Sequence, residues 1–218
     1  MEIKKVLITV KTYPTISKKY DELVCTAGVL ENGSWIRIYP MPFRKLDFES
    51  QYKKYQWLEA PFEKNESDVR PESYQIADVN KIKLLHTIGT NDNWSERRRF
   101  LLNNQQIFTN LKNLIAKANQ NELSLAIFKP TRIHDFISET TDREWSKEKL
   151  DMLKAKSKQM SFFQTPEEIE EAFSVVPKLP YRFSYKFVDD AGTESTPDDR
   201  GLGNWYALLE LPQRMQKP

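Results

Sequence analysis

The segment 21–39 constrains the fold more than any other part of the chain, because two extended runs flank a turn. Residues 21–30, DELVCTAGVL, and 34–39, SWIRIY, are rich in β-branched and apolar side chains. Asn32-Gly33 lies between them, and Asn-Gly is the strongest short-range signal for a two-residue hairpin, since a type I′ turn needs positive φ at both central residues. The sequence therefore predicts an antiparallel β-hairpin here.

A two-residue turn at Asn32 and Gly33 would also set the register of the hairpin, with Leu30 opposite Trp35. One face would then be small and apolar, as a core face should be; it would hold Val29, Ala27, Cys25, Ile36 and Ile38. The other face would hold Leu30, Gly28, Thr26, Trp35, Arg37 and Tyr39. Because glycine has no side chain, position 28 would leave a shallow slot beside Arg37.

The remaining chain alternates short strands with a few helices. The clearest helix is 95–118, in which Ser95 provides an N-cap and the apolar residues keep a helical period. Helices are also expected at 141–158, with Thr141 and Glu144 in capping-box spacing, and at 165–176. Further strands are expected at 4–13, 79–89, 123–128, 132–138, 179–188 and 204–211.

Many short strands with few helices favour an α+β fold containing small barrels or curved sheets. The central amphipathic helix would separate two antiparallel β subdomains that pack around it. The predicted organisation is an N-terminal β subdomain over 1–90, a connecting helix within 91–120 and a C-terminal α+β subdomain over 121–218.

Composition excludes several classes of protein. The 218 residues are 39% hydrophobic and 29% charged, enough apolar residues for a packed core. No apolar run approaches the ~18 residues of a membrane span, and the N-terminus lacks a signal-peptide cleavage site. A single cysteine, Cys25, leads us to expect a cytoplasmic protein. One cysteine and two histidines cannot form a cysteine-rich zinc site, and no phosphate-binding glycine loop is present, so no metal or cofactor is expected.

Three stretches are similar to a known group of proteins. The segment VCTAGVLENGSWIRIYPMPFR resembles the C-x-A-G…G-x-W-I-R pattern of bacterial proteins with a dual OB-like domain, and SLAIFKPTRIHDFIS and LPYRFSYKFVDD resemble their second half. The resemblance implies two OB-like β subdomains and an association with nucleic acid, and it brings no catalytic residues. The matching positions are Cys25, Ala27, Gly28, Gly33, Trp35, Ile36 and Arg37.

The row Trp35, Arg37, Tyr39 is the first candidate site. OB-type sheets bind single strands by stacking bases on exposed aromatic rings, while nearby cations contact phosphates. An arginine between two rings suits this role, because its planar guanidinium stacks or binds phosphate in a bidentate manner. The alternative is that a helix covers the rings and that the arginine pairs with a carboxylate.

Two further groups of cations could extend this surface. Arg97, Arg98 and Arg99 are expected in the first turn of the long helix, where a phosphate would bind favourably; the alternative is compensation by a nearby acid. Arg182 and Lys186 flank Ser184 on one side of the strand 179–188, opposite an expected aromatic core face. They could follow a phosphate backbone or form the solvated side of a sheet.

Two other functions remain open. Magnesium-dependent catalysis on nucleic acid or nucleotides would need convergent carboxylates, and the candidates are Asp142, Glu144, Asp189, Asp190, Asp198 and Asp199. These acids also sit at turn or cap positions, where aspartate is favoured for local hydrogen bonding. The aromatic row could instead be a docking site for a protein partner.

The leading prediction is a protein that binds single-stranded or unwound DNA or RNA with little sequence preference. The residues expected to contact the nucleic acid are Lys11, Trp35, Arg37, Tyr39, Arg44, Arg97, Arg98, Arg99, Arg182 and Lys186.

Overall fold

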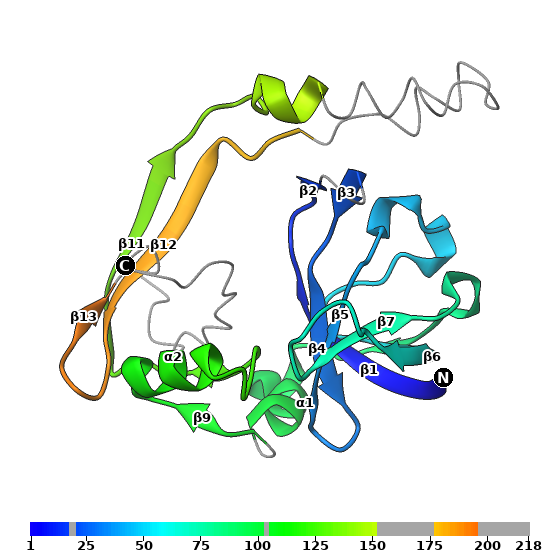
Figure 1. The fold of residues 1–218 in the computed structure, drawn as a ribbon. Coiled ribbons are helices and arrows are strands. Elements are labelled where there is room, and N and C mark those ends of the chain that lie inside the picture. Colours follow the sequence, from blue (N-terminus) through cyan, green and yellow to red (C-terminus); the bar gives the residue numbers. More distant parts are fainter. Residues whose placement is uncertain (18–20, 103–104, 152–176, 196–218) are drawn as a thin grey trace.

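A closed five-stranded β-barrel forms the first half of the molecule, as the computed structural model shows (Figure 1). The structure describes residues 1–17, 21–102, 105–151 and 177–195. The barrel strands are β1 (Glu2–Lys11), β4 (Thr26–Leu30), β5 (Trp35–Ile38), β6 (Gln56–Lys64) and β7 (Ser73–Ile76). They are ordered β1-β4-β5-β7-β6, and β6 pairs back with β1. The predicted small barrel is thus confirmed for this half.

The barrel is antiparallel except for one pair of strands, β5 and β7, which run parallel. The strand β8 (Lys83–Thr87) adds to β6 outside the closed ring. A separate small hairpin consists of β2 (Thr15–Ser17) and β3 (Asp21–Leu23). Three short 3₁₀ turns, η1 (Phe43–Lys45), η2 (Phe48–Ser50) and η3 (Val79–Lys81), connect the barrel strands.

Apolar side chains fill the interior of the barrel. They include Val6, Ile8, Ile36, Ile38, Met41, Leu58 and Phe62, all less than 2% exposed. The phenol of Tyr52 also lies in this core and shares a hydrogen bond with the hydroxyl of Thr26. Burial raises the pKa of Tyr52 above its ordinary value, so the neutral hydroxyl is the form that the core contains.

The predicted hairpin is present, but its register differs by one residue. Val29, not Leu30, lies opposite Trp35. The loop has three residues, because the amide of Leu30 donates to the carbonyl of Ser34 at 2.9 Å and the amide of Gly33 donates to the carbonyl of Leu30 at 2.9 Å. Gly33 has a φ of 86°, as in a turn that ends with a left-handed residue. The same sequence thus adopts a longer turn than the predicted type I′.

The corrected register redistributes the two faces. Ile36 and Ile38 point into the barrel, whereas Trp35 is paired with Val29 and packs with it outside the barrel. Gly28 does not leave a slot beside Arg37. It lies opposite Ile8 of β1, and a Cβ at this position would be 2.2 Å from the carbonyl oxygen of Leu7. Glycine at 28 therefore allows β1 and β4 to approach closely.

The single helix predicted over 95–118 is wrong. The structure has α1 (Asn91–Leu102) and α2 (Leu111–Asn119), with β9 (Ile107–Phe108) between them. The strand β9 pairs in parallel with β10 (Ile127–Phe128). The side chain of Asn110 accepts a hydrogen bond from the amide of Asn113 at 3.0 Å, so a new helix starts here. Strand pairing and this cap outweigh the helical period of the sequence.

The second half carries a long β-ribbon formed by β11 (Arg132–Thr140) and β12 (Tyr181–Val188), with β13 (Glu194–Ser195) beside β12. In Figure 1 the ribbon rises away from α2, and its far end approaches the β2/β3 hairpin. The helix expected from Thr141 starts at residue 147, because the amide of Thr141 continues the pairing with Pro180. The helix expected at 165–176 and the strand expected at 204–211 lie outside the described residues.

A second apolar layer joins the outside of the barrel to α1 and β10. Its buried members are Leu7, Val29, Trp57, Ile88, Leu101 and Ile127, and Trp35 and Phe100 pack against them. The side chain of Gln105 donates to the carbonyl of Gly33, which also links the hairpin to the second half. In the described part of the chain, no helix is long and apolar enough to cross a membrane.

Candidate functional site

The row Trp35, Arg37, Tyr39 is built into the packing of the molecule. Trp35 is half-buried against the apolar layer between the barrel and α1. The Nε of Arg37 lies 3.5 Å from Oδ2 of Asp68, and the guanidinium lies 5.2 Å from the ring centre of Tyr39, which is also half-buried. The structure thus agrees with the alternative for Trp35, which packs beside α1, and for Arg37, which pairs with an acid; Tyr39 is only half-buried.

The three arginines of α1 have different environments. Arg97 donates from Nε and Nη2 to the carbonyl oxygen of Ile88, at 3.3 and 3.0 Å, and lies 3.7 Å above the ring of Tyr55. Arg99 is exposed and 4.0 Å from Glu96. Arg98 is exposed and also has an interaction partner. Arg97 therefore attaches α1 to the barrel, and only its two neighbours lie at the surface.

A cluster of cations lies at one end of the barrel. The Nζ of Lys11 donates to the carbonyl of Tyr52 at 3.2 Å and lies 4.1 Å from the ring centre of Phe43. Burial and then the nearby charge of Lys54 lower the pKa of Lys11. We call this cluster the lysine end. It consists of Lys11 and Lys54, whose charges interact, and of Arg44 and Lys53, which directly follow Phe43 and Tyr52 in the chain.

The most exposed group of aromatic rings is on the β-ribbon. Phe136 is 51%, Tyr181 46% and Phe183 57% exposed. The ring centres of Phe136 and Phe183 are 5.7 Å apart with 10° between the planes, and those of Tyr181 and Phe183 are 6.1 Å apart with 22°. Tyr185 continues the row at 5.1 Å from Phe136. We call these four residues the aromatic ladder.

The alternation along residues 179–188 predicts an aromatic core face on this strand, and that prediction is wrong for most of the face. Among the aromatic residues of β12, only Phe187 is buried, at 6% exposed. It packs against Phe128 of β10, with 5.3 Å between ring centres. Strict alternation identified the row of rings, but nothing in the alternation shows which face is covered.

The opposite side of β12 carries the predicted polar residues. Nη1 of Arg182 lies 3.9 Å from Glu139, and Nζ of Lys186 lies 3.7 Å from Glu194. Both cations are about half exposed, so these ion pairs contribute little to stability. Ser184, which was predicted to be on a solvated face, is 9% exposed.

One hydrogen bond joins the segment after β1 to the segment that precedes β12. The hydroxyl of Tyr13 donates to the carbonyl oxygen of Pro177 at 2.8 Å. Tyr13 follows Lys11 closely in the chain, and Pro177 leads into β12 at the Tyr181 end of the ladder. The two halves of the chain are thus in contact at Tyr13 and Pro177, near this end of the ribbon.

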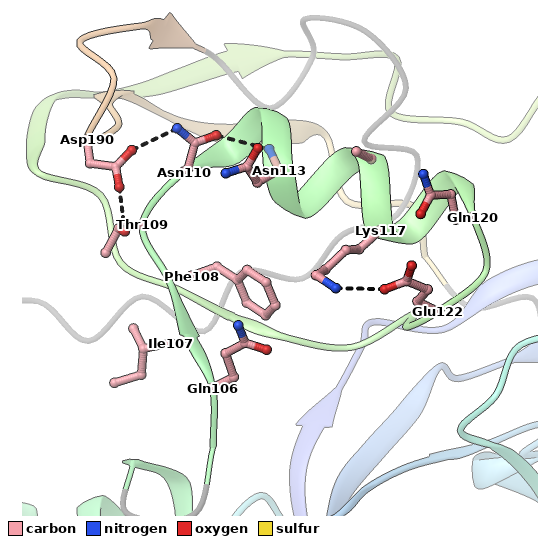
Figure 2. Close-up of a pocket in the computed structure, with 11 residues that line it drawn as sticks. Gln106, Ile107, Phe108, Thr109, Asn110, Asn113, Lys117, Gln120, Glu122 and Asp190 are labelled. Carbon is pink, nitrogen blue, oxygen red and sulfur yellow. Dashed lines mark hydrogen bonds and ion pairs between the residues drawn. The ribbon is translucent and has the colours of Figure 1, made fainter.

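An open pocket of about 490 Å³ lies between α2 and β9 (Figure 2). Side-chain amides dominate its polar lining, which includes Gln106, Asn110, Asn113 and Gln120. Sequence reasoning missed this pocket because its position was assigned to the interior of one continuous helix.

The acidic candidates serve structural roles where the structure describes them. Asp189 accepts hydrogen bonds from the amides of Leu111, Ala191 and Thr193 at 3.0 to 3.1 Å. Its burial opposes ionisation, but these bonds prevail and lower the pKa of the carboxyl group. Asp190 accepts from the side chains of Thr109 and Asn110.

The remaining acidic candidates do not complete a metal site in the described structure. Asp142 and Glu144 are exposed, and Asp198 and Asp199 lie outside the described residues. The described part of the chain contains no cluster of three residues able to hold a metal ion.

Comparison with known proteins gives two matches to family models. Residues 2–103, which include the barrel and α1, match the family described as "Domain of unknown function (DUF8758)". Residues 105–217 match a second family. No curated protein and no solved structure matches the chain. Because the second model spans more than half of the chain, the protein belongs to the family described as "Domain of unknown function (DUF8757)".

Proposed function

We propose that this protein binds single-stranded or unwound nucleic acid with little sequence preference, and that the aromatic ladder is its base-stacking surface. The observation that carries the proposal is the row of three exposed, nearly parallel rings, Phe136, Phe183 and Tyr181. Large apolar rings in contact with water are unfavourable unless a ligand covers them. Every base has a flat aromatic face, so a row of rings favours nucleic acid without selecting a sequence.

The ribbon holds the rings in a fixed row, which reduces the entropy lost when a ligand binds. Phe136 pairs with Tyr185 across the two strands, and Phe183 and Tyr181 follow at alternate positions along β12. Stacking of a base on such a ring contributes about 1–3 kcal/mol. Two or three stacked bases would therefore give useful affinity before any phosphate contact is made.

Cations near the ladder supply the phosphate contacts. At the lysine end, Lys53 and Lys54 are exposed and have no ion-pair partner among the described residues. Along the ribbon, the ion pairs of Arg182 with Glu139 and of Lys186 with Glu194 are exposed, and a phosphate can replace such pairs at low cost. Binding would release counterions and would weaken as salt concentration rises.

The proposal includes an OB-like character for the barrel. The order of its five strands and the single parallel pair, β5 and β7, support this proposal. In an OB fold the ligand face consists of the second and third strands. Here these strands are β4 and β5, and α1 together with Ile127 of β10 covers the outside of Val29 and Trp35. The face formed by β4 and β5 is thus covered by α1 and β10, which favours the ribbon as the binding surface.

The test is the affinity of a fluorescent single-stranded homopolymer for the double variant Phe136→Ser/Phe183→Ser. Removing two stacking rings should weaken binding about tenfold or more. Trp94→Ser is the matched control, because Trp94 is similarly exposed, at 42%, but lies on α1. A folded double variant that binds the oligonucleotide as the wild type does would refute the role of the ladder, and loss of a stable protein partner instead would identify it as a docking surface.

A further inference from the structure

The pocket between α2 and β9 has the composition of a site for a neutral, planar ligand. It is bounded by the helix on one side and by Ile107 and Phe108 on the other. In Figure 2 the ring of Phe108 and the side chain of Gln106 lie on the β9 side, and Lys117 reaches from α2 toward Glu122. Its volume of about 490 Å³ lies in the range of sites that hold small organic ligands.

Three of the side-chain amides that line this pocket are exposed and have no hydrogen-bond partner among the described residues. Asn113 lies on α2, and Gln120, the C-cap residue, follows it by seven positions, so both lie on the same side of the helix. Ala116 lies between them and leaves room for a ligand. No hydrogen bond to the side-chain amide of Gln106, Asn113 or Gln120 is found among the described residues. Each amide offers a donor beside an acceptor in one plane, a pattern that pairs with the edge of a base such as adenine.

The charged groups of the pocket are already neutralised, which argues against an anion or a metal ion as the ligand. Nζ of Lys117 lies 2.7 Å from Oε2 of Glu122. The carboxylate of Asp190 accepts from Thr109 at 2.6 Å and from Asn110 at 2.9 Å. A phosphate or a cation would have to displace one of these pairs, whereas a neutral base would leave them intact.

The frame of the pocket is held in place before any ligand arrives. Asp189 is 2% exposed and bonds the first amide of α2, at Leu111. Asn110 caps the same helix through Asn113. The strand β9 is paired with β10, whose Phe128 contacts Phe187 of the ribbon. Because these elements are already ordered, ligand binding would cost less conformational entropy than it would in a flexible site.

From these observations we propose that the pocket binds a single nucleobase that presents a hydrogen-bond donor next to an acceptor, as adenine does. The base would lie against Phe108 and pair with the side-chain amide of Asn113, with Gln106 and Gln120 beside it. This inference is independent of the aromatic ladder, which stacks bases without reading their edges.

The experiment titrates adenosine into the full chain and follows side-chain amide signals by nuclear magnetic resonance. Purine riboside, which lacks the amino donor, serves as the matched ligand. We expect adenosine to shift the signals of Gln106, Asn113 or Gln120 and to bind about fivefold or more tightly than purine riboside, as one hydrogen bond implies. Equal binding of the two nucleosides, or no shift of these amides at millimolar adenosine, would overturn the proposal.

Two variants locate the site. Asn113→Asp removes the donor of one lining amide, and Asn119→Asp makes the same change on α2 outside the pocket. Adenosine affinity should fall in the first variant and stay within about twofold in the second. Phe183→Ser should leave adenosine binding unchanged. If this variant loses adenosine binding, the nucleoside binds on the aromatic ladder, which overturns the pocket assignment but not the proposed function.

Discussion

Arg37 lies beside Asp68, with 3.5 Å between Nε and Oδ2, and the two side chains are only 19% and 13% exposed. The same carboxylate accepts from the hydroxyl of Ser73 at 2.8 Å, so the pair connects β5, β7 and the loop between β6 and β7. A residue that sequence reasoning assigned to a ligand is therefore part of the barrel. Its contribution to stability can be separated from a role in binding.

Replacing Arg37 by alanine should lower the free energy of unfolding by about 1–3 kcal/mol, because a largely buried carboxylate loses its main cationic partner. Arg70→Ala is the matched control. Arg70 lies 3.8 Å from the same carboxylate but is 45% exposed, and its loss should cost about 1 kcal/mol or less. Urea unfolding of both variants measures the difference. If Arg37→Ala unfolds at the wild-type urea concentration but binds the oligonucleotide more weakly, Arg37 contacts the nucleic acid and does not mainly stabilise the barrel.

Gly28→Ala should be severely destabilising, because the added methyl group would meet the carbonyl oxygen of Leu7 at 2.2 Å in the closed barrel. Relief requires β1 to move away from β4, and we expect a loss of about 3 kcal/mol or more. Gly89→Ala is the control, since its Cβ would have no neighbour closer than 3.9 Å. Thermal unfolding compares them, and equal midpoints for the two variants would contradict the close approach of the strands.

Asp189 should make the stability of the second half depend on acid pH. Its folded pKa lies below the ordinary value of 3.8, so the folded state binds fewer protons than the unfolded state near that pH. The resulting stabilisation is present above pH 3.8 and is lost as pH falls through the lower folded pKa. Asp189→Asn should remove this component, and the amide of Leu111 at the start of α2 should exchange faster with solvent. If this variant shows the wild-type pH dependence and the wild-type exchange rate, the hydrogen bond between the Leu111 amide and Asp189 does not stabilise the start of α2.

The sequence predicted the hairpin, although only Thr26–Leu30 of the expected strand 21–30 belongs to it. It could not distinguish between two turns. The residues around Asn32-Gly33 are compatible with a two-residue turn and equally with a three-residue loop in which Gly33 adopts the left-handed backbone conformation. The choice is settled by contacts that the local sequence does not contain. Val29 and Trp35 pack together under Leu101 of α1, and a shift of one residue places Trp35 on the other face.

The same limit applies to the candidate site. The alternation along residues 181–187 predicted that the aromatic rings share one face of the strand. Whether that face is buried depends on which other element packs against it, and the alternation does not show this. The apolar period of residues 95–118 suited one helix. The strand β9 forms within this range because it pairs with β10, which lies later in the chain and outside the local pattern. Pairings between distant segments thus decided both the covered face of the barrel and the pocket beside α2.

Changing the charge of the lysine end should alter the salt dependence of oligonucleotide binding. The double variant Lys53→Gln/Lys54→Gln removes two exposed cations that have no ion-pair partner among the described residues. If both contact phosphate, the slope of log affinity against log salt should become shallower by about 1.4, or 0.7 for each contact with a single strand. Fluorescence anisotropy across a series of salt concentrations measures the slope.

The matched control for this slope is Lys81→Gln/Lys83→Gln, which changes net charge equally. Lys81 lies 3.6 Å from Asp78 and Lys83 lies 3.4 Å from Glu59, so both have acidic partners on the barrel. If overall charge alone attracted the polymer, the two double variants would show the same slope. A steeper or unchanged slope for the lysine-end variant would mean that phosphates do not lie there, because counterion release counts only the cations that touch the backbone.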